Sequence, residues 1–375
     1  MKRCLPLLAV FLVLLALVGR VSAQASAEDH FMRAIAYMQK GDNAKAIADL
    51  DEAIKLLPDY ADAYMLRSNL KMSDDPSGAL ADLDKFVELR PTSGKGYYQR
   101  ALLRFASQDP AGALTDLDAS IANDYKEDHV YDLRGELRLE NGDLNGSLAD
   151  YDAAIKLNPD NANYYLSRAG LYLRLNNQVS ALVDLDHVIV WYEAGPQKSL
   201  PATARQANAA PTTNAEGAIA RPATNADSLP KVDIATQTKN PSPDDKEMVS
   251  PMAFTYERRA AIYSEIGNTD AALADLSMSL KLHPDARVYF ERAQELEKKG
   301  DLPGALADVN KSIELMANCG GCRLERGAIL TLQDKKIEAQ VDFDVLMKAG
   351  YATQARIDQT IEAARKRLPA RPNQD

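Results

Sequence analysis

Residues 27–58 read AEDHFMRAIAYMQKGDNAKAIADLDEAIKLLP, and residues 128–159 read DHVYDLRGELRLENGDLNGSLADYDAAIKLNP. Both stretches contain an Arg followed by a small residue, a turn with Gly, a second small residue three positions before an Asp, and a closing Pro. Such similarity at a fixed period is typical of repeat proteins, in which each unit buries its apolar face against its neighbours. These stretches therefore decide the fold class.

The most regular element is the small residue followed three positions later by Asp. Eight copies occur, and consecutive Asp residues are 33, 34, 34, 34, 91, 33 and 34 positions apart. One insertion therefore interrupts an otherwise regular array. The Asp residues are Asp49, Asp82, Asp116, Asp150, Asp184, Asp275, Asp308 and Asp342.

Each copy predicts two helices joined by a short turn. In the first copy, Ile47, Leu50, Ile54 and Leu57 follow the i, i+3, i+4 spacing of an amphipathic helix, and Pro58 ends it. No copy carries a strand signal. The sequence predicts an all-α solenoid of about eight helix-turn-helix hairpins.

The 34-residue period, the small residues, the Ala that opens the second helix and the terminal Pro resemble the tetratricopeptide repeat. An aromatic residue three positions after the small residue of the first helix, as at Tyr37, strengthens the resemblance. It covers about residues 27–350 apart from the insertion, and it implies a right-handed superhelical solenoid with a C-terminal capping helix. Lys71 and Arg104 depart from the aromatic position, and Phe86 stands where the motif has Ala.

An Arg directly precedes the small residue of the first helix in every copy. These arginines either line a binding groove as a row of cations or form ion pairs with the repeated Asp residues. Opposite charges that recur with the structural period favour ion pairs, and Arg suits bidentate contact with a carboxylate. The ladder arginines are Arg33, Arg67, Arg100, Arg134, Arg168, Arg259, Arg292 and Arg326.

The domain organisation follows from the spacing. The 91-residue gap exceeds one 34-residue period by 57 residues, which matches a stretch rich in Pro, Ala, Thr, Asn and Ser that should be disordered. The two repeat blocks either stand apart on this tether or stack with the tether looped out, and the apolar residues on both sides favour stacking. The predicted parts are a signal peptide (1–23), five repeats (24–195), the insertion (196–250), three repeats (251–350), and a capping helix with a tail (351–375).

The first residues predict export. Lys2 and Arg3 precede a 14-residue apolar run, and Ala23 supplies a small residue for cleavage before Gln24. The run is shorter than the roughly 20 residues that span a bilayer, so an uncleaved anchor is the weaker interpretation. We therefore expect a periplasmic or secreted protein of bacterial type, with no stable membrane span after signal cleavage.

Export changes how the cysteines are interpreted. Cys319 and Cys322 remain in an oxidising compartment, where a local disulfide is the simplest expectation and a redox-active pair is the alternative. Four isolated His residues do not complete a zinc site. We expect no metal and no cofactor.

Charge and motifs argue against nucleic-acid binding and catalysis. The formal net charge is −10, and residues 24–195 contain 29 Asp and Glu against 17 Lys and Arg. That acidity offers no basic field for nucleic acid. No P-loop, nucleophile elbow or metalloprotease motif occurs, so we expect no enzyme.

The resemblance implies that the first helix of each hairpin lines a concave groove. Carrying that geometry over to the first three repeats gives an apolar strip, whose alternative role is internal packing. Met and aromatic side chains suit adaptable contact with an apolar peptide or helix. The strip comprises Phe31, Ile35, Met38, Met65, Asn69, Met72, Tyr98, Leu102 and Phe105.

Together these features predict a non-catalytic protein-interaction scaffold or assembly factor of the cell envelope, whose partners are proteins with apolar or basic segments. Two alternatives stay open: a redox module that uses Cys319 and Cys322, and a purely structural spacer or oligomerisation module.

Overall fold

The structure, a computed structural model, describes residue 22, residues 24–194 and residues 245–369, with the backbone alone for 245–250. Apart from residue 22, the predicted signal peptide lies outside these residues, as does most of the predicted insertion. Helix α12 begins at Asp245, so the last six residues of the predicted insertion are helical. The described residues form helices and turns without a strand, as the periodicity predicts.

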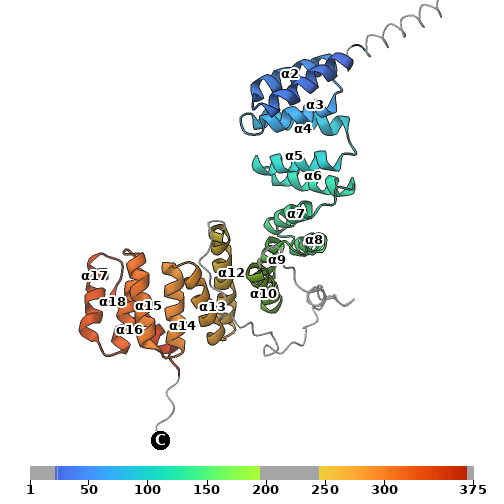
Figure 1. Ribbon diagram of the computed structural model, residues 1–375. Helices are drawn as coiled ribbons and strands as arrows, with labels where there is room; N and C mark the ends of the chain where they lie inside the picture. Colours follow the sequence, from blue (N-terminus) through green and yellow to red (C-terminus); the bar gives the residue numbers. More distant parts are fainter. Residues whose placement is uncertain (1–21, 23, 195–244, 370–375) are drawn as a thin grey trace, which may run out of the picture. The chain divides into compact units, whose positions relative to one another are not determined.

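The chain divides into two compact units, residues 1–158 and 159–375 (Figure 1). In the first unit, a helix over residues 24–39 is followed by α2 (Asn43–Leu56), α3 (Ala61–Lys71), α4 (Pro76–Leu89), α5 (Gly94–Ala106), α6 (Pro110–Ala122), α7 (Asp128–Glu140) and α8 (Leu144–Leu157). The second unit contains α9 (Ala162–Arg174), α10 (Gln178–Ala194), α12 (Asp245–Glu265), α13 (Thr269–Leu282), α14 (Ala286–Lys298), α15 (Leu302–Leu315), α16 (Gly320–Leu332), α17 (Lys336–Lys348) and α18 (Gln354–Arg367).

Consecutive helices pair into hairpins, and each hairpin packs on the next within its unit. In the second unit α10 packs on α12, so the repeats that flank the insertion are in contact. Tyr256 donates a hydrogen bond to Glu193 across this junction, with an O–O distance of 2.7 Å. The long gap between Asp184 and Asp275 therefore does not interrupt the stacking of their hairpins.

Local sequence sets the helix boundaries. Asp N-caps open several second helices, as at α6, where the Asp109 carboxylate accepts the Gly112 N–H at 2.9 Å. In most hairpins the turn before the second helix contains one left-handed residue. Gly41 (φ 75°) supplies it in the first hairpin, and Gln108 (φ 64°) supplies it in the third.

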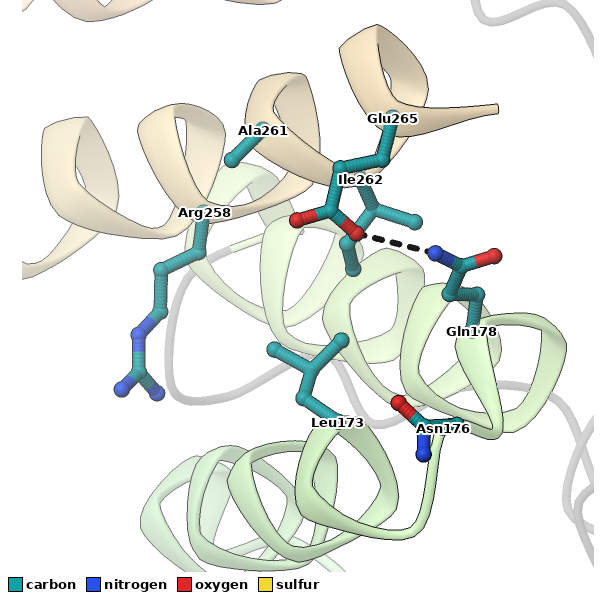
Figure 2. Close-up of a pocket in the computed structure, with 7 residues that line it drawn as sticks. All are labelled: Leu173, Asn176, Gln178, Arg258, Ala261, Ile262 and Glu265. Atoms are coloured by element: carbon teal, nitrogen blue, oxygen red, sulfur yellow. Dashed lines mark hydrogen bonds between the residues drawn. The ribbon is translucent and has the colours of Figure 1, made fainter.

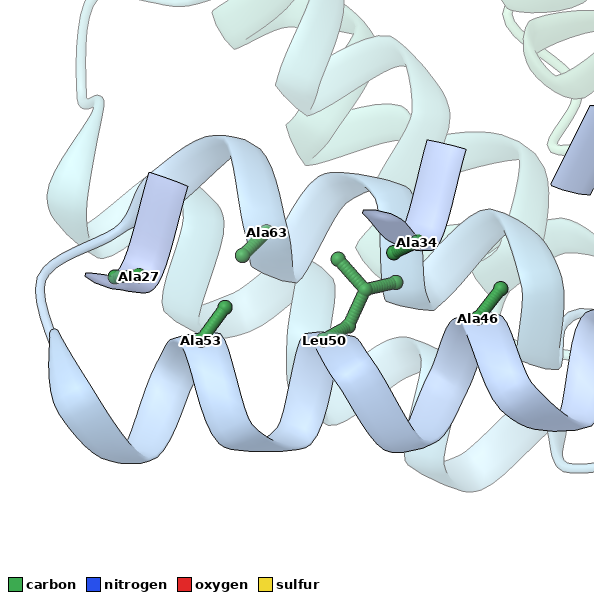
Figure 3. Packing of buried hydrophobic residues seen from close by; sticks show 6 residues of the cluster. All are labelled: Ala27, Ala34, Ala46, Leu50, Ala53 and Ala63. Carbon is green, nitrogen blue, oxygen red and sulfur yellow. The ribbon is translucent and has the colours of Figure 1, made fainter. Parts of the chain in front are cut away.

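Small residues let the paired helices approach closely. In the first hairpin Ala34, Ala46 and Ala53 are fully buried around Leu50 (Figure 3). Where the small residue of the first helix is Gly, the facing residue is aromatic, as at Gly327. A Cβ there would lie 2.3 Å from Cε1 of Phe343. A smaller residue on the first helix is thus compensated by a larger residue that faces it on the second helix, so that no cavity is left between them.

The Arg and Asp ladders pair within hairpins. Each ladder Arg donates two parallel hydrogen bonds to the ladder Asp of its own hairpin, through Nε and Nη2, at 2.5–2.9 Å. All eight carboxylates belong to buried residues, which are at most 8% exposed. Each ladder Arg therefore pairs with the ladder Asp of its own hairpin. These paired charges hold the two helices of a hairpin together and do not form a row of unpaired cations along a groove.

The third guanidinium nitrogen reaches the preceding hairpin. Arg100 Nη1 donates to Asp84 at 2.8 Å, and Arg134 Nη1 donates to Asp118 at 2.7 Å. In the second unit Arg326 Nη1 donates to Asn310 at 3.0 Å. One side chain thereby joins the two helices of its own hairpin and the second helix of the hairpin before it.

Lys71, Arg104 and Phe86, which depart from the repeat motif, are accommodated locally. Lys71 and Arg104 turn their cations toward the buried ladder carboxylates, with Nζ 3.4 Å from Asp82 and Nη1 2.9 Å from Asp116. Phe86 is buried because the following hairpin has Gly96 opposite it, where a Cβ would lie 2.3 Å from Cε1 of the ring. Repeats two and three are regular hairpins.

We expect Asp116→Ala to destabilise the first unit by about 3–5 kcal/mol, because it leaves Arg100 and Arg104 partly buried without their carboxylate. The matched control Asp118→Ala removes an exposed partner of Arg134 and should cost less than about 1 kcal/mol. Urea unfolding followed by circular dichroism measures both. Equal losses would contradict the assignment.

Candidate peptide-binding groove

The predicted apolar strip lies on the first helices of the first three hairpins, all within the first unit. The helix over residues 24–39 carries Phe31, Ile35 and Met38, α3 carries Met65 and Asn69 and ends beside Met72, and α5 carries Tyr98, Leu102 and Phe105. None of the nine residues is fully buried, and Asn69 and Leu102 are exposed. The strip residues of all three hairpins are therefore partly accessible to solvent.

The inner edges of these side chains also pack. Met65 contacts two buried clusters, one that contains Phe86 and one that contains Leu83. The ring centroid of Phe31 lies 5.0 Å from that of Tyr60. The strip side chains therefore pack against the hairpins on their inner side and are partly accessible to solvent on their outer side. Their geometry is compatible with internal packing and with a binding surface.

Aromatic side chains outside the predicted set also flank the strip, and the sequence did not predict them. Tyr98 lies 5.7 Å from Tyr125 and 4.7 Å from His129, measured between ring centroids. Tyr125 stands where the first two repeats carry their terminal Pro. That substitution is the signal by which the sequence could have revealed it.

The strip ends at an acidic surface on α7. Asp132 and Glu136 stand one turn apart, at the positions that Tyr98 and Leu102 occupy in the preceding hairpin. Neither has an ion-pair partner among the described residues. Burial, then Glu136 and Asp128, raises the pKa of Asp132 to about 6. A cation beside Asp132 and Glu136 would relieve the repulsion between these carboxylates.

A small cavity lies between the α9–α10 hairpin and α12 in the second unit (Figure 2). It encloses about 230 Å³, and a hydrogen bond from Gln178 to Glu265 at 2.9 Å crosses one side of it. Leu173, Ala261 and Ile262 supply its apolar lining. Its lining holds no nucleophile with an adjacent base. Across the described residues, no three His, Cys, Asp or Glu side chains are placed to hold a metal ion.

Cys319 and Cys322 form a disulfide at the start of α16. Cys319 is the N-cap residue, and its sulfur accepts the backbone N–H of Cys322 at 3.1 Å. Ser93 and Asn161 cap the corresponding helices of other hairpins with their side-chain oxygens. Cys322 is 4% exposed and packs in the core with Val309. The pair thus occupies one capping position and one core position.

A family model described as "TPR repeat" matches residues 35–70 and 135–176. These segments include Asp49 and Arg67 in the first match, and Asp150 and Arg168 in the second. The chain is a tetratricopeptide repeat protein. Proteins of this family serve as protein-interaction modules, and the structure extends the same hairpin to all eight copies.

Solved structures with similar folds include three bacterial proteins. A tetratricopeptide repeat protein of Parabacteroides merdae has 15% identity and a TM-score of 0.46, over 80% of this chain and 96% of that one. PilF of Pseudomonas aeruginosa has 14% identity and a TM-score of 0.45, over 73% and 97%. MamA of Desulfovibrio magneticus has 18% identity and a TM-score of 0.43, over 46% and 98%. No curated protein matches the sequence.

If the disulfide of this tetratricopeptide repeat protein is structural, Cys319→Ser with Cys322→Ser should destabilise the second unit by about 2 kcal/mol, the loop-closure value for so short a loop. The first unit should unfold at an unchanged urea concentration, which serves as the internal control. Hydrogen exchange of α16 measures the effect. Unchanged protection of α16 would contradict a structural role.

Proposed function

We propose that the protein is a non-catalytic scaffold or assembly factor of the cell envelope, and that it binds an apolar peptide or helix along the strip in its first unit. The observation that carries the proposal is the partial exposure of nine strip residues, eight of them apolar or aromatic, at equivalent positions of three successive hairpins. A surface of this kind marks an interaction site because water contact with it is unfavourable.

The chemistry of the strip indicates the kind of segment it binds. Three of the nine residues are Met, whose unbranched side chains adapt to irregular apolar surfaces. Asp132 and Glu136 continue the same face with negative charge. The favoured ligand is an amphipathic segment with apolar residues along its length and a Lys or Arg at the end that reaches α7.

The envelope location rests on the sequence of the first 23 residues. Within the residues that the structure describes, none of the helices is both long enough and apolar enough to cross a bilayer. A cleaved signal peptide would release the repeats into the periplasm or the medium, where the Cys319–Cys322 disulfide is stable.

Leu102 is the sharpest probe of the strip because it is 37% exposed, so that Leu102→Glu leaves the core intact. We expect this change to weaken partner binding at least tenfold, since it removes apolar contact and places a charge in the groove. A photo-crosslinker at position 102 of the mature protein in an envelope extract, followed by mass spectrometry, identifies the partner. Calorimetry with that partner then measures the loss.

Leu157 provides the matched control, because it is 52% exposed at the end of α8, a second helix. Leu157→Glu should bind the partner as the unchanged protein does, and a crosslinker at 157 should not capture it. Equal binding by the Leu102→Glu and Leu157→Glu variants would exclude the strip as the binding surface.

We expect the protein purified from its own cells to begin at Gln24 and to be recovered in the periplasmic fraction or the medium. Intact-mass spectrometry of the fractionated protein measures this, with a cytosolic enzyme as the fractionation control. A mass that includes residues 1–23, found in the membrane fraction, would instead establish an uncleaved anchor.

A further inference from the structure

The first helices of the last two hairpins are covered by the chain's own C-terminal helix. Helix α18 packs against α16 and reaches α14. Its apolar side buries Ile357 and Ala364, as the periodicity of residues 353–368 predicts for a closing helix. The face that carries the strip in the first unit therefore has an occupant in the second unit.

A single basic side chain joins α18 to a buried pair of acids. Arg367 Nε donates to Glu297 Oε2 at 2.9 Å, and Arg367 Nη2 donates to Glu325 Oε1. Glu297 on α14 is 0% exposed and Glu325 on α16 is 5% exposed. Glu297 stands at the groove position that Met38, Met72 and Phe105 fill in the first three hairpins.

The acid pair is incompletely neutralised. Two carboxylates face one guanidinium, and Oε1 of Glu297 has no hydrogen-bond partner when both acids are ionised. Burial, then the neighbouring Glu325, raises the pKa of Glu297 to about 8, and Arg367 opposes this shift. Glu325 from α16 and Arg367 from α18 are the charged groups that face it.

We propose that the face of α14 and α16 beneath α18 is a second binding surface, specific for an amphipathic helix that presents an arginine to Glu297 and Glu325, and that α18 occupies it as a displaceable internal ligand. This inference is independent of the strip in the first unit. Charge complementarity identifies the occupant, since a buried carboxylate pair, one member of which stands at a groove position, is favourable only with a cation against it.

Docking of α18 should depend on pH. The pKa of Glu297 is raised when α18 is docked and returns toward its ordinary value of about 4.5 when water enters. The docked state therefore binds the proton more tightly. Docking is strongest below about pH 5 and weakens as the pH rises through about 8.

A peptide-exchange experiment tests the proposal on the full mature chain. A fluorescent peptide of residues 352–369 should bind the Arg367→Ala protein at least tenfold more tightly than it binds the unchanged protein. The same peptide with Arg367→Ala should lose that binding. Arg365→Ala is the matched control, because Arg365 is exposed and its ion pair among the described residues is with Glu362 on its own helix, at 3.1 Å.

If the Arg367→Ala protein fails to fold, hydrogen exchange of the unchanged protein tests whether α18 leaves its surface. After correction for intrinsic rates, α18 should exchange faster than α15, more so at pH 8.5 than at pH 5.5, and Glu297→Gln should remove the pH dependence. Exchange of α18 only together with α15 at both pH values would show α18 to be a permanent cap. Equal binding of the two peptides would show that the surface does not recognise the arginine. Either result would overturn the proposal.

Discussion

The paired hydrogen bonds between each ladder Arg and its Asp are the interaction on which the stacking of this protein depends. A guanidinium has five donors in a fixed plane, so it satisfies a buried carboxylate with two of its nitrogens and still reaches another helix with the third. In hairpins three and four that third partner is an Asp two positions beyond the ladder Asp of the preceding hairpin. One side chain thus holds the two helices of a hairpin together and also fixes the position of that hairpin on the preceding one.

Burial makes this arrangement demanding as well as stabilising. A carboxylate such as Asp116, 1% exposed, is tolerated only because two basic side chains contact it. Lys71 and Arg104 illustrate the same requirement, since they replace an aromatic residue of the repeat motif by a second cation for the same acid. Where the aromatic is present, as at Tyr172 and Tyr263, the ladder Arg lies about 5.7 Å from the ring centroid. The array accepts either solution.

The features that recur in every hairpin could be predicted from the sequence, whereas the contacts that occur in one place could not. The period of Asp residues, the small residues and the paired charges foretold the hairpins and the identity of the ladders, because each is a local rule applied eight times. The partial burial of Phe31 and Tyr98 depends on Tyr60, Tyr125 and His129, which are not part of the repeated pattern of small residues, Arg and Asp. The pairing of Glu297 with Arg367 joins residues 70 positions apart and has no periodic signal. Both features arise from tertiary contacts that composition and spacing do not encode.

The fit between Phe86 and Gly96 bears on the order of the hairpins. Hairpin two presents a phenyl ring to its successor, and only hairpin three has a vacancy for it, because hairpin four carries Val130 and hairpin five carries Tyr164 at the matching place. An array of interchangeable modules risks folding with a unit skipped or exchanged between molecules. Any other hairpin packed against Phe86 would clash with the ring, so assemblies with a missing or exchanged hairpin are sterically disfavoured at this junction. The departure from the family motif at Phe86 thus helps to specify the order of the hairpins.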